Sequence, residues 1–358
     1  MTNIISIATA VPKFCHQQKN ILHFMQQAFG LDETEKRKLS FLYHQSGIEK
    51  RYSVIEDFSL PKNEWSFLSH PFPDLNLRMK LFKQEALSLS INAIKKCIEG
   101  IIDPSQITHL ITVSCTGMSA PGLDLEVMEE MKLSPNIFRS SVNFMGCYAA
   151  IHALKLAQMI CNTDKNANVI IVSTELCTLH FQHNYTLDNA ASSLLFADGS
   201  AAVLLSNSTF EKPVLQLNHF YSAVAFKGKQ DMAWEISSKG FLMTLSGYVP
   251  QLIEEDIAAL VDAALQKSKM NKKDITHWCL HPGGRKIIDT IQKQLSLCDC
   301  SMNYARKILS EYGNMSSPTI LFVLKEIMDN LKADKPANIF GVAFGPGLTM
   351  ETFIASSA

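Results

Sequence analysis

The chain contains the stretch Ser141-Val142-Asn143-Phe144-Met145-Gly146-Cys147-Tyr148-Ala149-Ala150, in which a Gly-Cys turn separates two periodic segments. The apolar run over residues 137–144 predicts a buried strand, and residues 149–157 carry apolar side chains at helical spacing. Cys147 therefore lies at a helix start, where unpaired N–H groups and the helix dipole favour a thiolate. Such a position lowers a cysteine pKa from about 8.5 to roughly 3.5–7.5. A small buried cysteine that only packs remains an equal alternative at this point.

Size and composition limit the class of protein. The chain has 358 residues, 47% hydrophobic and 19% charged, which is enough for one large domain or two fused ones. A formal net charge of −1 gives no overall field that would attract nucleic acid or a membrane surface. The sequence has no run of 18 apolar residues, and residues 1–12 are typical of a first strand rather than a signal peptide. We expect a cytoplasmic protein with no nucleic-acid partner and no membrane span.

The cysteines point to the same compartment. There are nine, an odd number without regular spacing, which predicts free thiols in a reducing cytosol. Cys298 and Cys300 form the only tight pair, and no second pair lies near them. Because structural zinc takes four ligands, we expect no metal site.

The chain repeats itself. Three pairs of segments correspond in order: 103–109 with 271–277, 144–150 with 311–317, and 167–172 with 337–342. His109 precedes Cys147 by 38 positions, and His277 precedes Asn314 by 37. Matched landmarks at nearly equal spacing predict a duplicated unit.

The duplication predicts the fold class and brings two turns together. Each copy alternates strand and helix, so we expect an α/β protein with two βαβαβ halves, residues 1–208 and 209–358, and mostly parallel central sheets. Packing about a pseudo-twofold axis would place Cys147 and Asn314 at equivalent helix starts. Ligands should then bind near the carboxyl ends of the strands.

Two further residues are candidates for chemistry with Cys147. His281 ends the first strand of the second copy, where Pro282-Gly283-Gly284 breaks the strand and lets the ring project into a shared pocket. A thiol nucleophile needs such a proton acceptor, although a histidine can also simply cap a strand. Asn314 is a good helix N-cap, and its neutral amide could alternatively polarise a thioester carbonyl and stabilise an enolate.

A glycine-rich stretch, Gly345-Pro346-Gly347, lies near the C-terminus between two apolar segments. It lacks the spacing of a P-loop or a dinucleotide fingerprint. We expect a tight turn between strands that shapes a pocket wall through its backbone.

Together these motifs resemble the type III polyketide synthases of the chalcone synthase superfamily. The matching stretches are 143–147, 195–199, 280–284, 311–317 and 344–349. The resemblance covers the chain from about residue 46 onward. It implies the duplicated thiolase fold, with a five-layered αβαβα core, and a homodimer.

The resemblance also implies a reaction. Cys147 would take an acyl group from coenzyme A, His281 would hold the thiolate as an ion pair, and both His281 and Asn314 would bind the thioester carbonyl. Malonyl-CoA would then lose carbon dioxide, and its enolate would attack the acyl-enzyme in repeated Claisen condensations. No metal or redox cofactor is implied. Phe196 falls at a gatekeeper position, and Ser316, Gly345, Pro346 and Gly347 fall in substrate-binding motifs.

Departures from the plant enzymes indicate a reshaped cavity. Met243 stands at the second gatekeeper position, Trp234 at a cavity glycine, and His180 at a threonine. The cavity is therefore not expected to make a chalcone.

Small residues indicate where an acyl chain could go. Ala120 lies in the dimer-crossing loop 115–122, and with Thr116 and Cys177 it resembles bacterial relatives that open a tunnel for long acyl chains. About 0.8 kcal/mol per buried methylene favours an alkyl tail there. We therefore expect medium- or long-chain fatty acyl starters and alkylpyrone or alkylresorcinol products.

The carrier of the acyl group is less well defined. Of the cationic positions that hold coenzyme A phosphates in the family, only Lys38 is kept, while Phe41 and Gln45 replace the others. Both acyl-CoA and an acyl carrier protein stay open as donors.

Other functions remain as alternatives. An initiating ketoacyl-carrier-protein synthase shares the fold and the catalytic set, but typically has His-Gln-Ala-Asn where this chain has residues 281–284. A synthase that makes tetrahydroxynaphthalene from malonyl-CoA alone is a further alternative. Hydroxymethylglutaryl-CoA synthase would need a catalytic glutamate that the motifs do not place beside Cys147. A binding protein on the same scaffold would be expected to have lost one of the three residues.

Overall fold

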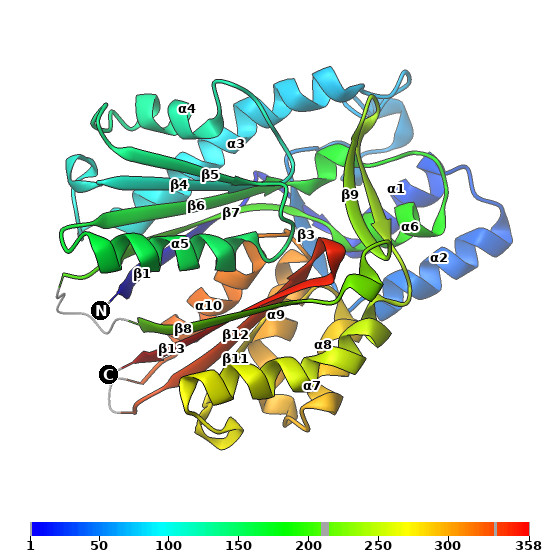
Figure 1. Ribbon diagram of the computed structural model, residues 1–358. Helices are drawn as coiled ribbons and strands as arrows, with labels where there is room; N and C mark the ends of the chain where they lie inside the picture. The colour runs from blue at the N-terminus through cyan, green and yellow to red at the C-terminus, as the bar shows by residue number, and fades with distance from the viewer. Residues whose placement is uncertain (1, 209–214, 333–334, 358) are drawn as a thin grey trace.

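The computed structural model describes residues 2–208, 215–332 and 335–357. Within them, nine strands hydrogen-bond into one sheet (Figure 1). Their order across the sheet is β11 (His277–Leu280), β12 (Asn338–Gly345), β13 (Thr349–Ser357), β8 (Leu215–Val224), β1 (Asn3–Ala10), β7 (Asp198–Ser206), β6 (Asn168–Leu176), β4 (His109–Ser114) and β5 (Phe138–Asn143). The first four strands in this order correspond, in reverse, to the next four, and β5 lies beyond them at the edge. The two halves meet where β8 pairs with β1.

Helices divide the molecule into five layers. The central layer holds α5 (Ala149–Thr163) and α10 (Thr319–Asp329), each of which contacts strands of both halves. One outer layer contains α3 (Leu75–Ile98) and α4 (Leu123–Glu130). The other contains α7 (Val249–Ser268), α8 (Arg285–Gln294) and α9 (Asn303–Tyr312) (Figure 1).

Three hydrophobic cores fill the spaces between these layers, one around α5 and α10 and one beneath each outer layer. Burial of apolar surface between layers is the main force holding such a stack together. The predicted αβαβα architecture is confirmed.

The duplication is visible at the level of single hydrogen bonds. The Thr108 hydroxyl donates to the Asn168 carbonyl at 3.1 Å and accepts from its N–H at 2.9 Å. The Thr276 hydroxyl makes the same two bonds to Asn338, at 3.0 and 2.9 Å. Each pair joins the residue before a strand, β4 or β11, to the start of the parallel strand beside it, β6 or β12.

Strand direction differs from the expectation. In the large sheet only β4–β5, β4–β6 and β11–β12 are parallel ladders, among the residues described. The other ladders are antiparallel, because β7 and β13 each return beside the strand before them. The prediction of mostly parallel sheets was wrong.

The strand before Cys147 also differs from the prediction of a buried strand. β5 is an edge strand, and in this chain five of its six residues are exposed. Its sequence, Phe-Arg-Ser-Ser-Val-Asn, is largely polar, which agrees with an edge that one chain alone leaves open.

The N-terminal half carries an additional layer over one end of the sheet. It consists of α1 (Gln18–Ala28), α2 (Glu33–Gln45), α6 (Leu187–Leu195) and the short pair β2 (Phe14–Gln17) and β3 (Lys50–Ser53). The hairpin of β9 (Met232–Ser237) and β10 (Gly240–Leu245) lies beside this layer (Figure 1).

The cysteines differ from the prediction. Cys298 and Cys300 form a disulfide, so the prediction that all nine cysteines are free thiols was wrong; their Cα atoms are 5.3 Å apart, close enough to bridge. Seven other cysteines are free.

The predicted boundary between residues 208 and 209 adjoins residues 209–214, which lie outside the described part of the chain. None of the helices described is both long and apolar enough to cross a membrane.

Candidate active site

Cys147 lies in a turn whose shape requires glycine. Gly146 has φ of 85°, in the left-handed region. A Cβ added to Gly146 would lie 2.2 Å from Cδ of Pro346, and one added to Gly345 would lie 2.6 Å from the Tyr148 ring. The C-terminal Gly-Pro turn therefore packs directly on the turn that presents Cys147.

Asn314 occupies the matching turn of the second half. Gly313 before it has φ of 70°, as Gly146 does before Cys147. The Asn314 backbone bonds to the carbonyl of Leu195 and the N–H of Ala197, both at 2.9 Å, which ties this turn to the first half. Its side-chain oxygen accepts from the Ser316 N–H at 2.8 Å, and its NH₂ group donates to the Gly283 carbonyl at 3.4 Å, which leaves one amide N–H for a ligand.

One cavity brings the predicted catalytic residues together. Cys147, His281 and Asn314 line it from three different segments of the chain. Other predicted residues that line it are Thr116, Cys177, Phe196, Trp234, Met243, Ser316 and Pro346. The Cys147 thiol donates to the Ser316 hydroxyl at 3.5 Å.

His281 is the least satisfied polar side chain of this cavity. Its backbone N–H bonds to the Val342 carbonyl at 2.9 Å, which fixes the strand end. The side chain is only 1% exposed, yet neither ring nitrogen has a hydrogen-bond partner. A buried, unpaired imidazole facing a cavity is costly unless a ligand group binds there.

Loss of water is the main influence on the pKa of both Cys147 and His281. Desolvation raises the pKa of Cys147 to about 11, against hydrogen bonds from Ser316 and Asn314 that favour the thiolate. Desolvation also lowers the pKa of His281 to about 3. The expected lowering of the cysteine pKa at a helix start is therefore wrong here, because loss of water outweighs the hydrogen bonds that favour the thiolate.

Glu175, at the end of β6, is a residue that sequence reasoning missed. It is fully buried, and burial raises its pKa. One carboxylate oxygen accepts from the Thr116 hydroxyl at 2.7 Å and the Cys115 N–H at 2.8 Å, and the other accepts from the Ser317 hydroxyl at 2.6 Å. The carboxylate thus joins the two halves behind the catalytic cavity. A single charged residue in an otherwise uncharged strand was the available signal.

Trp234 and His180 fasten the β9–β10 hairpin to the loop after β4. The Trp234 indole donates to the Cys115 carbonyl at 2.7 Å, and His180 Nε2 lies 2.7 Å from the Thr116 carbonyl. His180 Nδ1 accepts from the Phe241 N–H at 3.0 Å, so Nε2 carries the proton. Desolvation lowers the pKa of His180 to about 3, in agreement with this neutral form.

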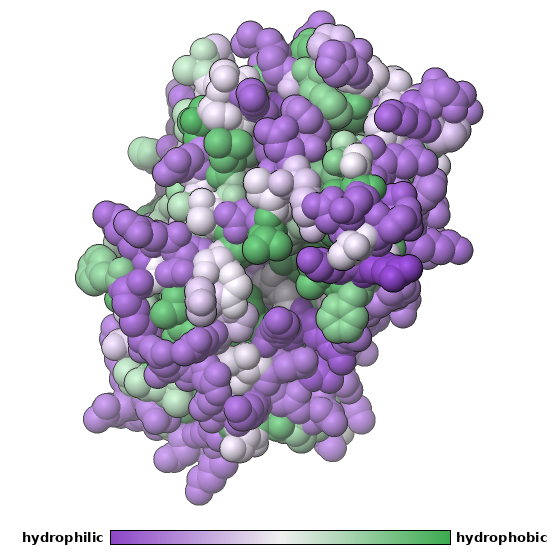
Figure 2. Space-filling model, turned by 90° about the vertical axis from the view of Figure 1, so that its right-hand side faces the viewer, coloured by the Kyte–Doolittle hydropathy of each residue, from purple (hydrophilic) through white to green (hydrophobic). Residues whose placement is uncertain are grey.

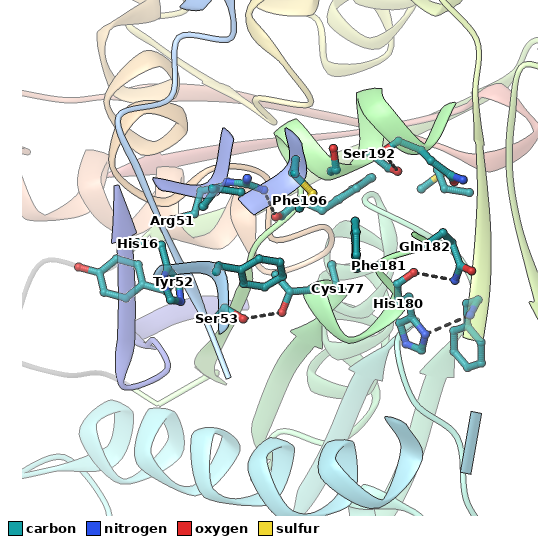
Figure 3. A pocket seen from close by; sticks show the side chains of 18 of the residues that line it. His16, Arg51, Tyr52, Ser53, Cys177, His180, Phe181, Gln182, Ser192 and Phe196 are labelled. Carbon is teal, nitrogen blue, oxygen red and sulfur yellow. Dashed lines mark hydrogen bonds between the residues drawn. The ribbon is translucent and has the colours of Figure 1, made fainter. Parts of the chain in front are cut away.

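A second cavity adjoins the Cys147 cavity, and Figure 3 shows side chains that line it. It shares Cys177, Phe196, Trp234 and Met243 with the Cys147 cavity. His180 lines only this second cavity. It lies beneath the face formed by α1, α2, α6 and β9, which is hollowed near its centre and carries hydrophobic side chains around the hollow (Figure 2).

Some predicted residues are not part of either cavity within one chain. Ala120 is exposed in the loop after β4 and lines a separate surface pocket with Met118 and Pro121. Lys38 is exposed on α2 and lines neither cavity. Gly345 packs against the Tyr148 ring and the Cys147 backbone, and neither Gly345 nor Gly347 lines the cavity.

Comparison with solved structures gives the class of protein. The structure matches PKS-I from the brown alga Ectocarpus siliculosus with a TM-score of 0.91 and 27% identity, covering 100% of this chain and 98% of that one. It matches the C-terminal type III polyketide synthase domain of Steely1, a type I/III hybrid from Dictyostelium, with a TM-score of 0.91 and 26% identity over 99% and 98% of the two chains. The fold is the thiolase-like fold of type III polyketide synthases.

Sequence comparison gives the family. Residues 1–208 match the model for chalcone and stilbene synthases, N-terminal domain, and residues 219–358 match the model for the C-terminal domain. A "Putative chalcone synthase" of Bacillus subtilis (strain 168) is 30% identical over 370 residues, covering 99% of each chain. The chain belongs to the chalcone and stilbene synthase family, whose members are acyltransferases that act on coenzyme A thioesters.

Proposed function

We propose that this type III polyketide synthase condenses malonyl-CoA repeatedly onto an acyl group carried by Cys147. The observation that supports this most is the cavity in which Cys147, Asn314 and an unpartnered, buried His281 meet. Cysteine, base and amide donor are the groups that acyl transfer through a thioester needs.

The first step is transfer of the acyl group. Neutral His281 accepts the thiol proton as the Cys147 sulfur attacks the thioester carbonyl, so the imidazolium forms only during this step. The amide NH₂ of Asn314 donates to the developing oxyanion. The tetrahedral intermediate collapses, the coenzyme A sulfur leaves and takes the proton from His281, and the acyl group stays on Cys147.

The second step forms a carbon–carbon bond. The carboxylate of malonyl-CoA leaves as carbon dioxide, and the electron pair of the broken bond becomes an enolate stabilised by His281 and Asn314. The enolate carbon attacks the acyl carbonyl and expels the Cys147 thiolate. The lengthened chain then returns to Cys147 for the next cycle, without a metal or redox cofactor.

We further propose medium- or long-chain fatty acyl starters that give alkylpyrone or alkylresorcinol products. Apolar side chains dominate the lining near Cys147, including Phe196, Met243 and Trp234. Burying an alkyl chain against them is favourable by about 0.8 kcal/mol per methylene. Since Ala120 lies outside this cavity in one chain, Thr116 and Cys177 are the remaining small residues, and of these Cys177 also lines the second cavity.

The starter and reaction can be tested together. Malonyl-CoA is incubated with acyl-CoAs from acetyl to palmitoyl, and products are identified by mass spectrometry, with Cys147→Ala as the blank. Fatty acyl products with two or three added acetate units would support the proposal. A single condensation in every case would instead indicate a ketoacyl synthase, and tetrahydroxynaphthalene from malonyl-CoA alone would refute the starter.

A homodimer and the acyl donor are part of the proposal. The open edge of β5, with Phe138 71% exposed, and the exposed loop after β4 offer an edge on which a second copy can pair. Light scattering of the wild type and of Phe138→Asp would show whether this edge carries the dimer. Presenting one starter on coenzyme A and on an acyl carrier protein would identify the donor.

A further inference from the structure

Helix α2 exposes apolar and cationic side chains on one face. Phe41 is 65% exposed and Leu42 is 38% exposed, and Arg37 and Lys38 lie four positions before them, one turn along the helix. Apolar groups that gather on a surface and are rimmed by polar ones mark a site where a partner binds. The end of the molecule that carries α2 shows hydrophobic and strongly hydrophilic side chains around a hollow (Figure 2).

The cations on and beside this face are available to an anionic partner. Lys36 pairs with Glu33 at 2.7 Å, but Arg37 and Lys38 take part in none of the ion pairs found within the described residues. Lys286, at the start of α8, is exposed and is likewise absent from those pairs. Such cations attract negative charge and steer its approach.

Helix α2 lies close to the catalytic cavity. The turn after α2 packs on the start of α8, because a Cβ added to Gly47 would lie 3.5 Å from Cδ of Arg285. Gly283 and Ile287, on either side of Arg285 in the sequence, line the Cys147 cavity. A thioester arm that is anchored on α2 therefore passes only the start of α8 on its way to Cys147.

The neighbouring helix α6 enlarges the apolar area. Leu187 at its start is 78% exposed, and the Tyr43 hydroxyl of α2 lies 3.4 Å from the Ser193 hydroxyl of α6. Both helices lie away from the β5 edge on which a second copy can pair (Figure 1). One adenine ring can cover Phe41 but not apolar groups on two helices, so this area fits a protein better than the nucleotide of coenzyme A. The α2–α6 face consists of Arg37, Lys38, Phe41, Leu42 and Leu187.

We propose that the α2–α6 face docks a small acidic carrier protein, which delivers the acyl group on a phosphopantetheine arm. Acidic side chains of the carrier pair with Arg37 and Lys38, and its apolar side chains cover Phe41. The acyl group moves from the sulfur of the arm to the sulfur of Cys147, and the arm leaves as a thiol with the proton from His281. This inference rests on the proposed function and chooses between its two donors.

The test measures the choice of donor with a single starter. Octanoyl-CoA is compared with a bacterial acyl carrier protein that carries an octanoyl-phosphopantetheine arm, each with malonyl-CoA as extender. We expect kcat/KM to be higher for the loaded carrier by about tenfold or more, because it alone covers the α2–α6 face. The Kd of the loaded carrier, measured by fluorescence anisotropy on Cys147→Ala, should rise with salt because the charge pairs are screened.

An equal or lower kcat/KM for the loaded carrier would overturn the inference, while turnover of octanoyl-CoA would still support the proposed function. No turnover from either donor would refute the proposed function, and the anisotropy measurement would then decide the docking face by itself. Binding to vesicles of phosphatidylglycerol and phosphatidylcholine, without binding to the carrier, would assign the face to a membrane surface and overturn the inference.

Variants of exposed residues locate the carrier on this face. Phe41→Ser should lower kcat/KM for the loaded carrier by about tenfold and change that for octanoyl-CoA by less than about twofold, whereas Phe41→Leu should keep the preference. Arg37→Glu should raise the Kd of the carrier, and Lys96→Glu, an exposed change at the far end of α3, should not. An unchanged donor preference in Phe41→Ser and an unchanged Kd in Arg37→Glu would place the carrier elsewhere and overturn the inference.

Discussion

The two halves of the molecule share one duplicated fold, and they carry different residues at one pair of equivalent turns. Gly146 and Gly313 both have a positive φ, and each leads through a short turn to a helix of the central layer. The first half presents Cys147 after this glycine and the second presents Asn314. Duplication thus supplies two equivalent positions at one cavity, and a single difference makes one a nucleophile and the other a neutral donor.

The halves also differ in what is added to the frame. The second half contributes His281 and the β9–β10 hairpin, while the first contributes the N-terminal layer of α1, α2 and α6. The catalytic groups come from the duplicated fold, and most of the lining of the second cavity comes from the hairpin and the N-terminal layer. The comparison teaches that the reaction and the choice of substrate can change separately in this fold.

Replacing Cys147 should have the largest effect on activity, because neither of the two equivalent turns then carries a nucleophile. We expect Cys147→Ala to lower product formation by more than about a thousandfold, since no covalent intermediate can form. Intact-protein mass spectrometry after incubation with an acyl-CoA should show no acyl adduct. Cys15→Ser, an exposed control, should keep both. An adduct that persists in Cys147→Ala would place the acyl group elsewhere.

Removing the Asn314 amide from the second turn should lower activity less than removing Cys147. Loss of one oxyanion donor typically lowers kcat by about 10²–10³. We expect this from Asn314→Ala and also from Asn314→Asp, which can still accept from the Ser316 N–H but has no NH₂ group to donate. Acylation of Cys147 can be followed separately by rapid quench. Unchanged kcat in Asn314→Asp would mean that the side chain only caps the turn.

The duplicated frame could be predicted because its signals are local and repeated. Spacing from His109 and His277 placed two Gly turns in register, and the structure shows the same Thr and Asn hydrogen bonds in both halves. Cys147, His281 and Asn314 could be proposed because glycine turns and strand ends limit where they can lie. Their meeting in one cavity agrees with that proposal, while their catalytic roles stay predictions.

The remaining features depend on packing that no local pattern encodes. The pKa of Cys147 follows from how fully its surroundings exclude water, which reverses the prediction made from a helix start. The position of Ala120 outside the cavity and the link through Glu175 both depend on how distant segments meet. β5 was predicted to be buried because an apolar boundary was weighted above its polar centre.

Acid should destabilise the protein through its buried histidines. Burial lowers the pKa of His16 to about 4 and of His180 and His281 to about 3, against about 6.5 when unfolded. The folded form then binds fewer protons, so the stability is present above pH 6.5 and is lost as pH falls toward 3.

Two carboxyls act in the opposite direction over part of this range. Burial raises the pKa of Asp198 to about 6 and also raises that of Glu175, so both bind protons more readily when folded. We expect a net loss of stability between pH 6 and 4.5, measured by urea unfolding. In His180→Gln the slope should fall by about 1.4 kcal/mol per pH unit. An unchanged slope would mean that His180 is charged in the folded protein.

The repeated threonine bonds give the smallest but most direct comparison of the halves. Thr108→Val and Thr276→Val each remove a hydroxyl that bonds both backbone groups of an asparagine. Thr108 is partly buried, so Asn168 should lose a partner that water cannot fully replace, at a cost of about 1–2 kcal/mol. Thr276 is exposed, and water can replace its hydroxyl, so the cost should stay below about 1 kcal/mol. Equal costs from urea unfolding would mean that burial does not distinguish the two copies, and that the matched bonds stabilise both halves alike.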